Sequence, residues 1–162
     1  MSSSGYDVQQ VCLNGHQITP SARTNPHLTK PRCPCCGEKT IMACPTCDAP
    51  IRGRCRVHGV VATRRIPVPT HCHACGAAYP WRRSAIVAAI AALETELGGR
   101  IPSEVIALIW LIGAETARTE MAALQLRRML RVLGQPAYDT TVKLVADVTS
   151  ETARTILQMK QP

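Results

Sequence analysis

The stretch CPCCGEKTIMACPTC, residues 33–47, contains five cysteines in fifteen residues, and four of them form two C-x-x-C pairs. A third C-x-x-C pair follows at Cys72 and Cys75, and a Cys-x3-His pair precedes at Cys12 and His16. Four ligand pairs are enough for two tetrahedral sites with sulfur and imidazole ligands, a set that zinc prefers. The sequence therefore predicts two zinc ions per chain.

The residues around the pairs have the turn chemistry of zinc knuckles. The position after the second cysteine of such a turn favours a left-handed backbone, which glycine adopts without strain and aspartate tolerates. Gly37, Asp48 and Gly76 occupy that position in the three turns, and Pro34 and Pro45 restrict two of the turns further. One C-x-x-C pair is a weak signal, but three with this chemistry are a strong one.

Two pairings of the ligand pairs are open. Sequential pairing gives a tandem zinc ribbon, in which each site joins two turns through a connection of sixteen or twenty-four residues, suitable for a hairpin. A cross-brace, as in RING-type ligase modules, joins the first pair with the third and the second with the fourth. We expect sequential pairing, because a RING usually carries its histidine in a middle pair. The predicted ligands are Cys12, His16, Cys33 and Cys36 in site one, and Cys44, Cys47, Cys72 and Cys75 in site two.

Both metals are expected to be structural. Each site has four good ligands, whereas a catalytic zinc keeps one position open for water. Residues 1–83 hold only three carboxylates, and neither H-E-x-x-H nor H-x-E followed by P-C-x-x-C is present. We therefore expect no enzyme. Cys35 is interpreted as a bystander thiol inside the first turn, and Cys55 lies in the connection within site two.

The composition changes at Arg83. All nine cysteines and all five histidines precede Ser84, and residues 1–83 hold eleven Lys/Arg against three Asp/Glu, a net of +8. Residues 84–162 hold eight of each and have the pattern of helices. The predicted fold is a small α+β protein, with tandem zinc ribbons of short β-hairpins in residues 1–83 and a helical bundle in residues 84–162. Pro80–Arg83 is expected to be a short joint.

Three helical segments are expected in the second half. The first begins at Ser84 as N-cap, stops at Gly98, and is apolar on nearly every face, which predicts burial. The second runs from Ser103 to Gly134 with a possible break at Gly113 or Thr116. Its core stripe is Ala122, Leu126, Met129, Leu130 and Leu133. The third begins at Asp139 as N-cap and runs to about Met159, with a core face of Val142, Val145, Thr149, Ala153 and Ile156.

Arginines alternate with small or apolar residues in IRGRCRVHGVV, residues 51–61. On a strand, alternate side chains share a face, so three arginines would line one side of a hairpin, with two more on the return strand. Such a face is suited to phosphates or acidic side chains, although most runs of charge are only solvated. The candidate binding residues are Arg52, Arg54, Arg56, Arg64 and Arg65.

The N-terminus and the apolar runs bear on the compartment. MSSSGYDVQQVCLNGH has neither the basic nor the apolar region of an export signal. Residues 85–93 and 105–113 are the longest apolar runs, and both are far shorter than the roughly 18 residues that span a bilayer. We therefore expect a cytoplasmic protein without a membrane span, in which clustered cysteines indicate metal and not disulfides.

Four motifs carry a resemblance to a known family. CLNGH, CGEKTIMACPTCDAPIRG and HCHACGAAYPW in the first half, and TSETARTIL near the end, resemble an uncharacterised family of bacterial double-zinc-ribbon proteins. The resemblance covers both halves of the chain. It implies a bacterial, intracellular protein with zinc at the eight predicted ligands, and it implies no activity.

Two classes of function follow from these observations. The first is a zinc-binding adaptor, in which ribbons present a basic hairpin and the helices bind a protein partner or a second copy. The alternative is a nucleic-acid-binding zinc ribbon that uses the arginines. Against the alternative, aromatic residues that could stack on bases are few in the first half: Tyr79 and Trp81 are the candidates besides Tyr6 near the N-terminus, and Trp81 is expected to be a plug between ribbon and bundle. A RING-like ligase module ranks third.

Overall fold

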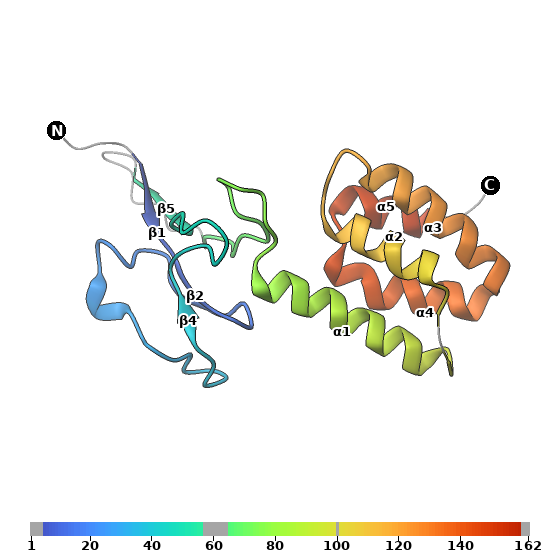
Figure 1. Cartoon of the computed structure of the whole chain (residues 1–162), viewed down its shortest axis with the longest axis horizontal. Helices are drawn as coiled ribbons and strands as arrows, with labels where there is room; N and C mark the ends of the chain where they lie inside the picture. Colours follow the sequence, from blue (N-terminus) through green and yellow to red (C-terminus); the bar gives the residue numbers. More distant parts are fainter. Residues whose placement is uncertain (1–4, 57–64, 100, 160–162) are drawn as a thin grey trace. The chain divides into compact units, whose positions relative to one another are not determined.

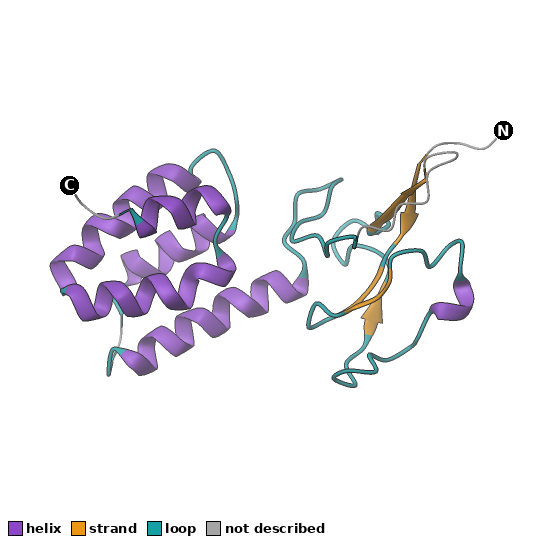
Figure 2. Cartoon of the chain, turned by 180° about the vertical axis from the view of Figure 1, so that it is seen from behind, coloured by secondary structure: helices purple, strands orange, loops and turns teal. Residues whose placement is uncertain are grey.

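The computed structural model describes residues 5–56, 65–99 and 101–159. It has short antiparallel strands in the N-terminal part and five α-helices in the C-terminal part, as Figure 2 shows, so the chain is of the α+β class. It divides into two compact units, residues 1–82 and residues 83–162. Each unit is described by itself.

Two small antiparallel sheets form the first unit. Strand β1 (Gly5–Val8) pairs with β5 (Arg52–Arg56), and β2 (Gln10–Cys12) lies between β3 (Gln17–Thr19) and β4 (Thr40–Ile41). Figure 1 shows β1 continuing into β2 along one direction, so that a single extended segment contributes to both sheets. A 3-10 turn, η1 (Pro26–Leu28), lies in the connection between β3 and β4.

The strand partner of the arginine segment differs from the expectation. A return strand at Arg65 would have paired with β5, but β5 pairs with β1, and residues 65–69 have no regular structure. The remainder of the predicted hairpin, including Arg64, lies outside the described residues. The pairing with β1 joins residues almost fifty positions apart, a separation that no local sequence pattern reveals.

The second unit is a bundle around α3 (Thr119–Leu133), which packs against α2 (Ser103–Gly113), α4 (Gln135–Val145) and α5 (Glu151–Gln158). A 3-10 turn, η2 (Ala146–Val148), links α4 to α5. One apolar core joins all five helices. Its fully buried large side chains are Ile86, Leu93, Val105, Ile109, Ile112, Leu126, Leu130 and Leu157. The expected break near Gly113 is confirmed, since α2 ends there.

The first helix begins earlier than predicted and is only half covered. α1 (Pro80–Glu96) starts with Pro80, so the expected joint is its first turn and Ser84 lies inside the helix, not at its cap. Ile86, Ala89 and Leu93 face the core, but Val87 is 55% exposed. The prediction that this helix is buried all round is therefore wrong, because a helix rich in alanine buries one face and leaves the small side chains of the other in solvent.

The last predicted helix is two helices. α4 begins at Gln135, four residues before Asp139, and the chain breaks before Ser150, which caps α5 by accepting a hydrogen bond from the Ala153 amide. Val145, Thr149 and Ala153 are buried as expected. Leu133 of the second predicted stripe is 46% exposed, because α3 ends there and the chain turns away at Gly134. No described helix is long and apolar enough to cross a membrane.

Candidate metal centres

The three C-x-x-C turns fold alike. Each is the tip of a miniature hairpin, closed by a hydrogen bond from the first cysteine's amide to a carbonyl five residues later; the pairs are Cys33–Glu38, Cys44–Ala49 and Cys72–Ala77. The residue after the second cysteine has the predicted left-handed backbone, with φ of 72° at Gly37, 57° at Asp48 and 73° at Gly76. The residues after the second cysteines therefore adopt the backbone conformation that the sequence predicted.

The fourth turn is the tip of the β2–β3 hairpin. The Gly15 amide bonds to the Cys12 carbonyl at 2.9 Å, and the His16 amide points at Cys12 Sγ at 3.3 Å. Gly15 has φ of 88°, and a Cβ there would lie 3.1 Å from Trp81 Cβ. Both the backbone conformation and the close approach of Trp81 therefore require glycine between the two ligands.

The structure brings the eight predicted ligands together in two groups of four, paired sequentially. Site one contains Cys12, His16, Cys33 and Cys36, and site two contains Cys44, Cys47, Cys72 and Cys75; within each group all ligand atoms lie within 4.8 Å of one another. In each group two ligands are buried and two are exposed. The cross-brace alternative is not formed.

The distances inside each group match the edges of a tetrahedron. Two sulfurs each about 2.3 Å from a tetrahedral zinc lie about 3.8 Å apart, and a sulfur and an imidazole nitrogen about 3.5 Å apart. In site one, Cys12 Sγ lies 3.8 Å from Cys36 Sγ and 3.5 Å from His16 Nδ1. In site two, the Sγ atoms of Cys44 and Cys75 are 3.8 Å apart and those of Cys47 and Cys72 are 3.7 Å apart. Both donor sets fit one ion of this size.

Backbone amides, neighbouring thiols and desolvation shift the pKa values of two thiols in site two. The amide of Cys75, together with that of Ala74, lowers the pKa of Cys72 to about 6 against the opposing effect of desolvation. The pKa of Cys47 instead rises to about 12: the Ala49 amide acts to lower it, but the Cys75 thiol and desolvation outweigh that effect. Four adjacent thiolates repel one another unless a cation lies between them.

A stacked aromatic pair lies beside both groups. The rings of Tyr79 and Trp81 are 4.6 Å apart and nearly parallel, and both side chains are buried with Cys44 and Cys72 of site two. Trp81 also contacts Gly15 of the site-one turn, and its indole N–H donates to the Pro69 carbonyl at 2.8 Å. Burial, followed by the charge and hydrogen bond of Cys72, raises the pKa of Tyr79. Trp81 is thus a core residue of the first unit.

Two buried glutamines, Gln9 and Gln10, and the partly buried Gln17 complete this unit, and no sequence pattern predicted them. Gln9 donates to the carbonyls of Arg52 and Pro67, Gln10 exchanges hydrogen bonds with Lys30, and Gln17 donates to the Ile66 carbonyl. They tie irregular connections to the strands where a larger protein would use apolar side chains. Glutamine is most often exposed, so the sequence carries no clear signal for these positions.

The leftover thiols are exposed. Cys35 lies at the tip of the first C-x-x-C turn and Cys55 lies on β5. The Cys33 thiolate, followed by desolvation, raises the pKa of Cys35, which therefore favours its neutral form. His71 Nδ1 lies 3.0 Å from the Thr70 hydroxyl, so this ring contacts a threonine beside the site.

The predicted arginines that the structure describes do not share one environment. The Arg52 guanidinium lies over the Tyr6 ring, 4.9 Å from its centre. Arg54 and Arg56 line a cavity of about 370 Å³ together with residues of the β3–η1 connection. Arg65 is exposed. The alternating arginines of β5 therefore lie in two places: Arg52 packs on Tyr6, and Arg54 and Arg56 line the cavity.

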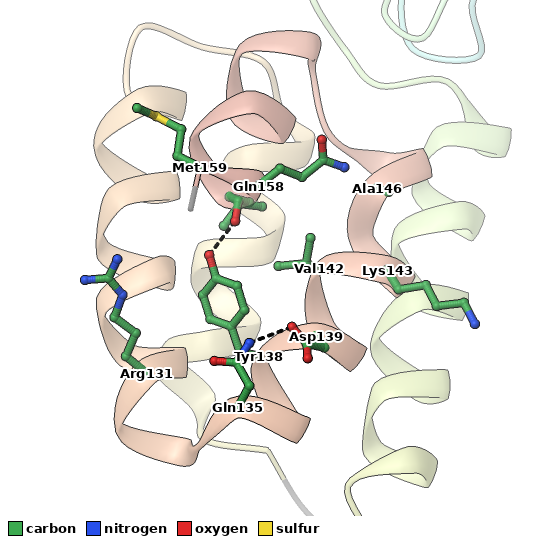
Figure 3. A pocket seen from close by; sticks show the side chains of 10 residues that line it. Arg131, Gln135, Tyr138, Asp139, Val142, Lys143, Ala146, Gln158 and Met159 are labelled. Atoms are coloured by element: carbon green, nitrogen blue, oxygen red, sulfur yellow. Dashed lines mark hydrogen bonds between the residues drawn. The ribbon is translucent and has the colours of Figure 1, made fainter. Parts of the chain in front are cut away.

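A larger cavity of about 850 Å³ lies among α3, α4 and α5 (Figure 3). Its centre contains Tyr138, whose hydroxyl donates to the Leu157 carbonyl, and Val142. Arg131 and Lys143 lie at opposite edges and point away from that centre. The charged groups that line this cavity therefore do not converge on one ligand.

Comparison with known proteins agrees with the resemblance. No curated protein and no solved structure matches the chain significantly. A family model described as "Uncharacterized protein conserved in bacteria (DUF2321)" matches residues 5–157, which include all eight ligands, helices α1 to α4 and all but the last residue of α5. The chain therefore belongs to this bacterial family.

Proposed function

We propose that the chain is a zinc-binding interaction protein, in which two structural zinc ions hold the first unit in shape so that it presents a basic surface to a partner. The observation that carries the proposal is the pair of four-ligand groups with tetrahedral edge lengths. The first unit has few large apolar side chains in its core, and metal ligation replaces the missing core energy.

A structural role for the metals is supported by their surroundings. Each group supplies four ligand atoms, so a bound zinc would have no open position for water or substrate. Of the three carboxylates in residues 1–83, Asp7 is buried and already accepts three hydrogen bonds. We therefore propose that the protein is not an enzyme.

Elemental analysis tests the metal assignment. We expect two zinc ions per chain, and Cys44→Ser should reduce the content to one because a closed site loses affinity steeply when one of its four ligands is replaced. Cys35→Ser and Cys55→Ser are matched controls, since both remove an exposed thiol outside the groups. Iron in place of zinc, a single metal ion in the wild type, or loss of zinc from Cys35→Ser would overturn the assignment.

The helical unit supports a role in association. Its exposed apolar side chains form stripes on two helices: Ala107, Trp110 and Leu111 of α2 with its C-cap Ala114, and Met121, Leu124 and Val132 of α3. Exposed apolar patches on a small bundle are typical of surfaces that bind protein. We propose that this unit binds a protein partner or a second copy.

A nucleic-acid-binding protein remains the second candidate, favoured by the charge. Seven thiolates and two zinc ions together carry −3, so the formal +8 of residues 1–83 becomes about +5 when both sites are loaded. The buried stacking pair weighs against it, because Tyr79 and Trp81 are 1% and 9% exposed and have no face to offer a base. A RING-like module is disfavoured by the sequential pairing.

A further inference from the structure

The cavity beside β5 is built by a close backbone approach. The Arg54 amide donates to the Pro20 carbonyl at 2.8 Å, and at Gly53 a Cβ would lie only 2.2 Å from that carbonyl. β5, which carries the arginines, is therefore in direct backbone contact with the segment that follows β3. This contact forms one side of the cavity of about 370 Å³.

A buried carboxylate anchors the same connection. Asp7 is 3% exposed, and its oxygens accept from the amides of Val8 and Arg23 and from the Thr24 hydroxyl. These bonds hold the connection between β3 and η1 against β1. Because Asp7 already has three donors, it does not depend on the arginines for hydrogen bonds.

The charges of the described residues that line the cavity do not sum to zero. Arg54 and Arg56 contribute two positive charges, and Asp7 contributes one negative charge, so the net charge of this described lining is +1. Ser21 and Asn25 add a hydroxyl and an amide to the lining. Guanidinium groups donate through a planar fork that matches oxyanions, and a concave wall excludes part of the competing water.

We propose that this cavity binds a single oxyanion group, a phosphate or a carboxylate carried by a partner. The proposal deepens the interaction role, because it places the contact in the cavity of Arg54 and Arg56 and not along the whole arginine strand. Arg52 lies outside the cavity and packs on Tyr6. Arg52 is thus an internal control, because it carries the same charge and lies on the same strand, two positions before Arg54.

The test is a titration of the full-length, zinc-loaded protein with inorganic phosphate and, separately, with glutamate, followed by amide chemical shifts at constant ionic strength. We expect saturable shifts in residues 20–28 and at Arg56 with at least one of the two ions. Arg56→Gln should weaken that binding at least about fivefold, whereas Arg52→Gln should change it less than about twofold, since a lost charge-assisted hydrogen bond weakens binding far more than a lost distant charge. Comparing the two ions identifies the preferred group.

A third arm uses an oligothymidine strand of about 20 nucleotides. If this strand binds and Arg52→Gln and Arg56→Gln weaken it equally, the arginines form a diffuse phosphate surface and the cavity proposal is wrong. Absence of saturable shifts with both small ions would also overturn it. Zinc content is measured on every variant, so that failure of the metal sites and failure of the anion site are distinguished.

Discussion

Gly53 has space for a hydrogen atom and for nothing larger. A Cβ at this position would lie 2.2 Å from the Pro20 carbonyl oxygen and 2.9 Å from the Gln9 amide nitrogen, and both atoms belong to the backbone and cannot rotate away. We expect Gly53→Val to destabilise the first unit by at least about 3 kcal/mol, the upper end of the usual cost of overpacking. Thermal unfolding of the zinc-loaded protein measures the loss.

Gly99→Ala is the control for that change. Among the described residues, no atom outside the immediate chain neighbours lies within 4 Å of a Cβ at Gly99, so this substitution should leave the melting temperature almost unchanged. Equal melting temperatures for Gly53→Val and the wild type would show that β5 does not pass this close to Pro20.

Asp7 allows a prediction about pH. Burial acts to raise its pKa, but the Thr24 hydroxyl and the amides of Val8 and Arg23 outweigh burial and lower it below the ordinary 3.8. A carboxyl group with a lowered pKa stabilises the fold at every pH above its unfolded value, and that stability is lost only as the pH falls through the lower folded value. Asp7→Asn should therefore cost about 1–2 kcal/mol, and the cost should be constant from pH 7 to pH 5.

Chemical denaturation of the wild type and Asp7→Asn at several pH values checks this expectation. Release of the proposed zinc ions at low pH would affect both proteins, so the comparison stays above pH 5. A difference that shrinks between pH 7 and pH 5 would contradict a lowered pKa for Asp7.

At the scale of the elements, the two groups of ligand side chains were predictable and several helix boundaries were not. A C-x-x-C turn is local, so its ligands, its glycine and its hairpin follow from a few adjacent residues. The pairing of β1 with β5 joins distant segments and left no periodic signal. The start of α1 was missed although Pro80 is a typical first helical residue, because the change of composition at Arg83 was taken as the start of the helical half.

The break between α4 and α5 was missed for a different reason. The predicted core face continues at helical spacing through Val145, Thr149 and Ala153, so the pattern resembles one helix. Ser150 competes with that pattern, because its side chain caps a new helix by accepting from the Ala153 amide at 3.3 Å. A local hydrogen bond of this kind decides the chain direction without changing the hydrophobic period.

The cap supplies a prediction for α5. Ser150→Ala should destabilise the helical unit by about 1 kcal/mol, the typical cost of losing an N-cap. Ser84→Ala is the matched control: the sequence suggested a cap there, but Ser84 is an exposed residue inside α1, where alanine is the better helix former. In urea denaturation, Ser150→Ala should have a lower free energy of unfolding than the wild type, and Ser84→Ala should have the same or a higher one. Equal losses would remove the cap assignment.

At the scale of the whole molecule, the exposed apolar stripes predict association. We expect sedimentation of the purified chain to show a species larger than a monomer, or a monomer that enters a complex. Leu111→Glu should weaken the self-association, because a charge at the centre of the α2 stripe would have to be desolvated in the interface. A monomer at all concentrations with no bound partner would count against the proposal.

Thr152→Glu is the control for charge alone. Thr152 is exposed in the first turn of α5, away from the stripes, and a carboxylate is favourable at that end of a helix. Association that weakens equally in both variants would indicate a general effect of net charge and not a docking surface.

The position of Trp81 gives the protein a built-in optical reporter. The chain has two tryptophans: Trp81 is 9% exposed between the two metal groups, and Trp110 is 38% exposed on α2. Removing metal should free the Tyr79–Trp81 stack and admit water to the Trp81 indole, which shifts its emission to longer wavelength, while Trp110 emits as before. In a Trp110→Phe variant, the emission wavelength of Trp81 would report whether the two sites hold metal, without any added dye.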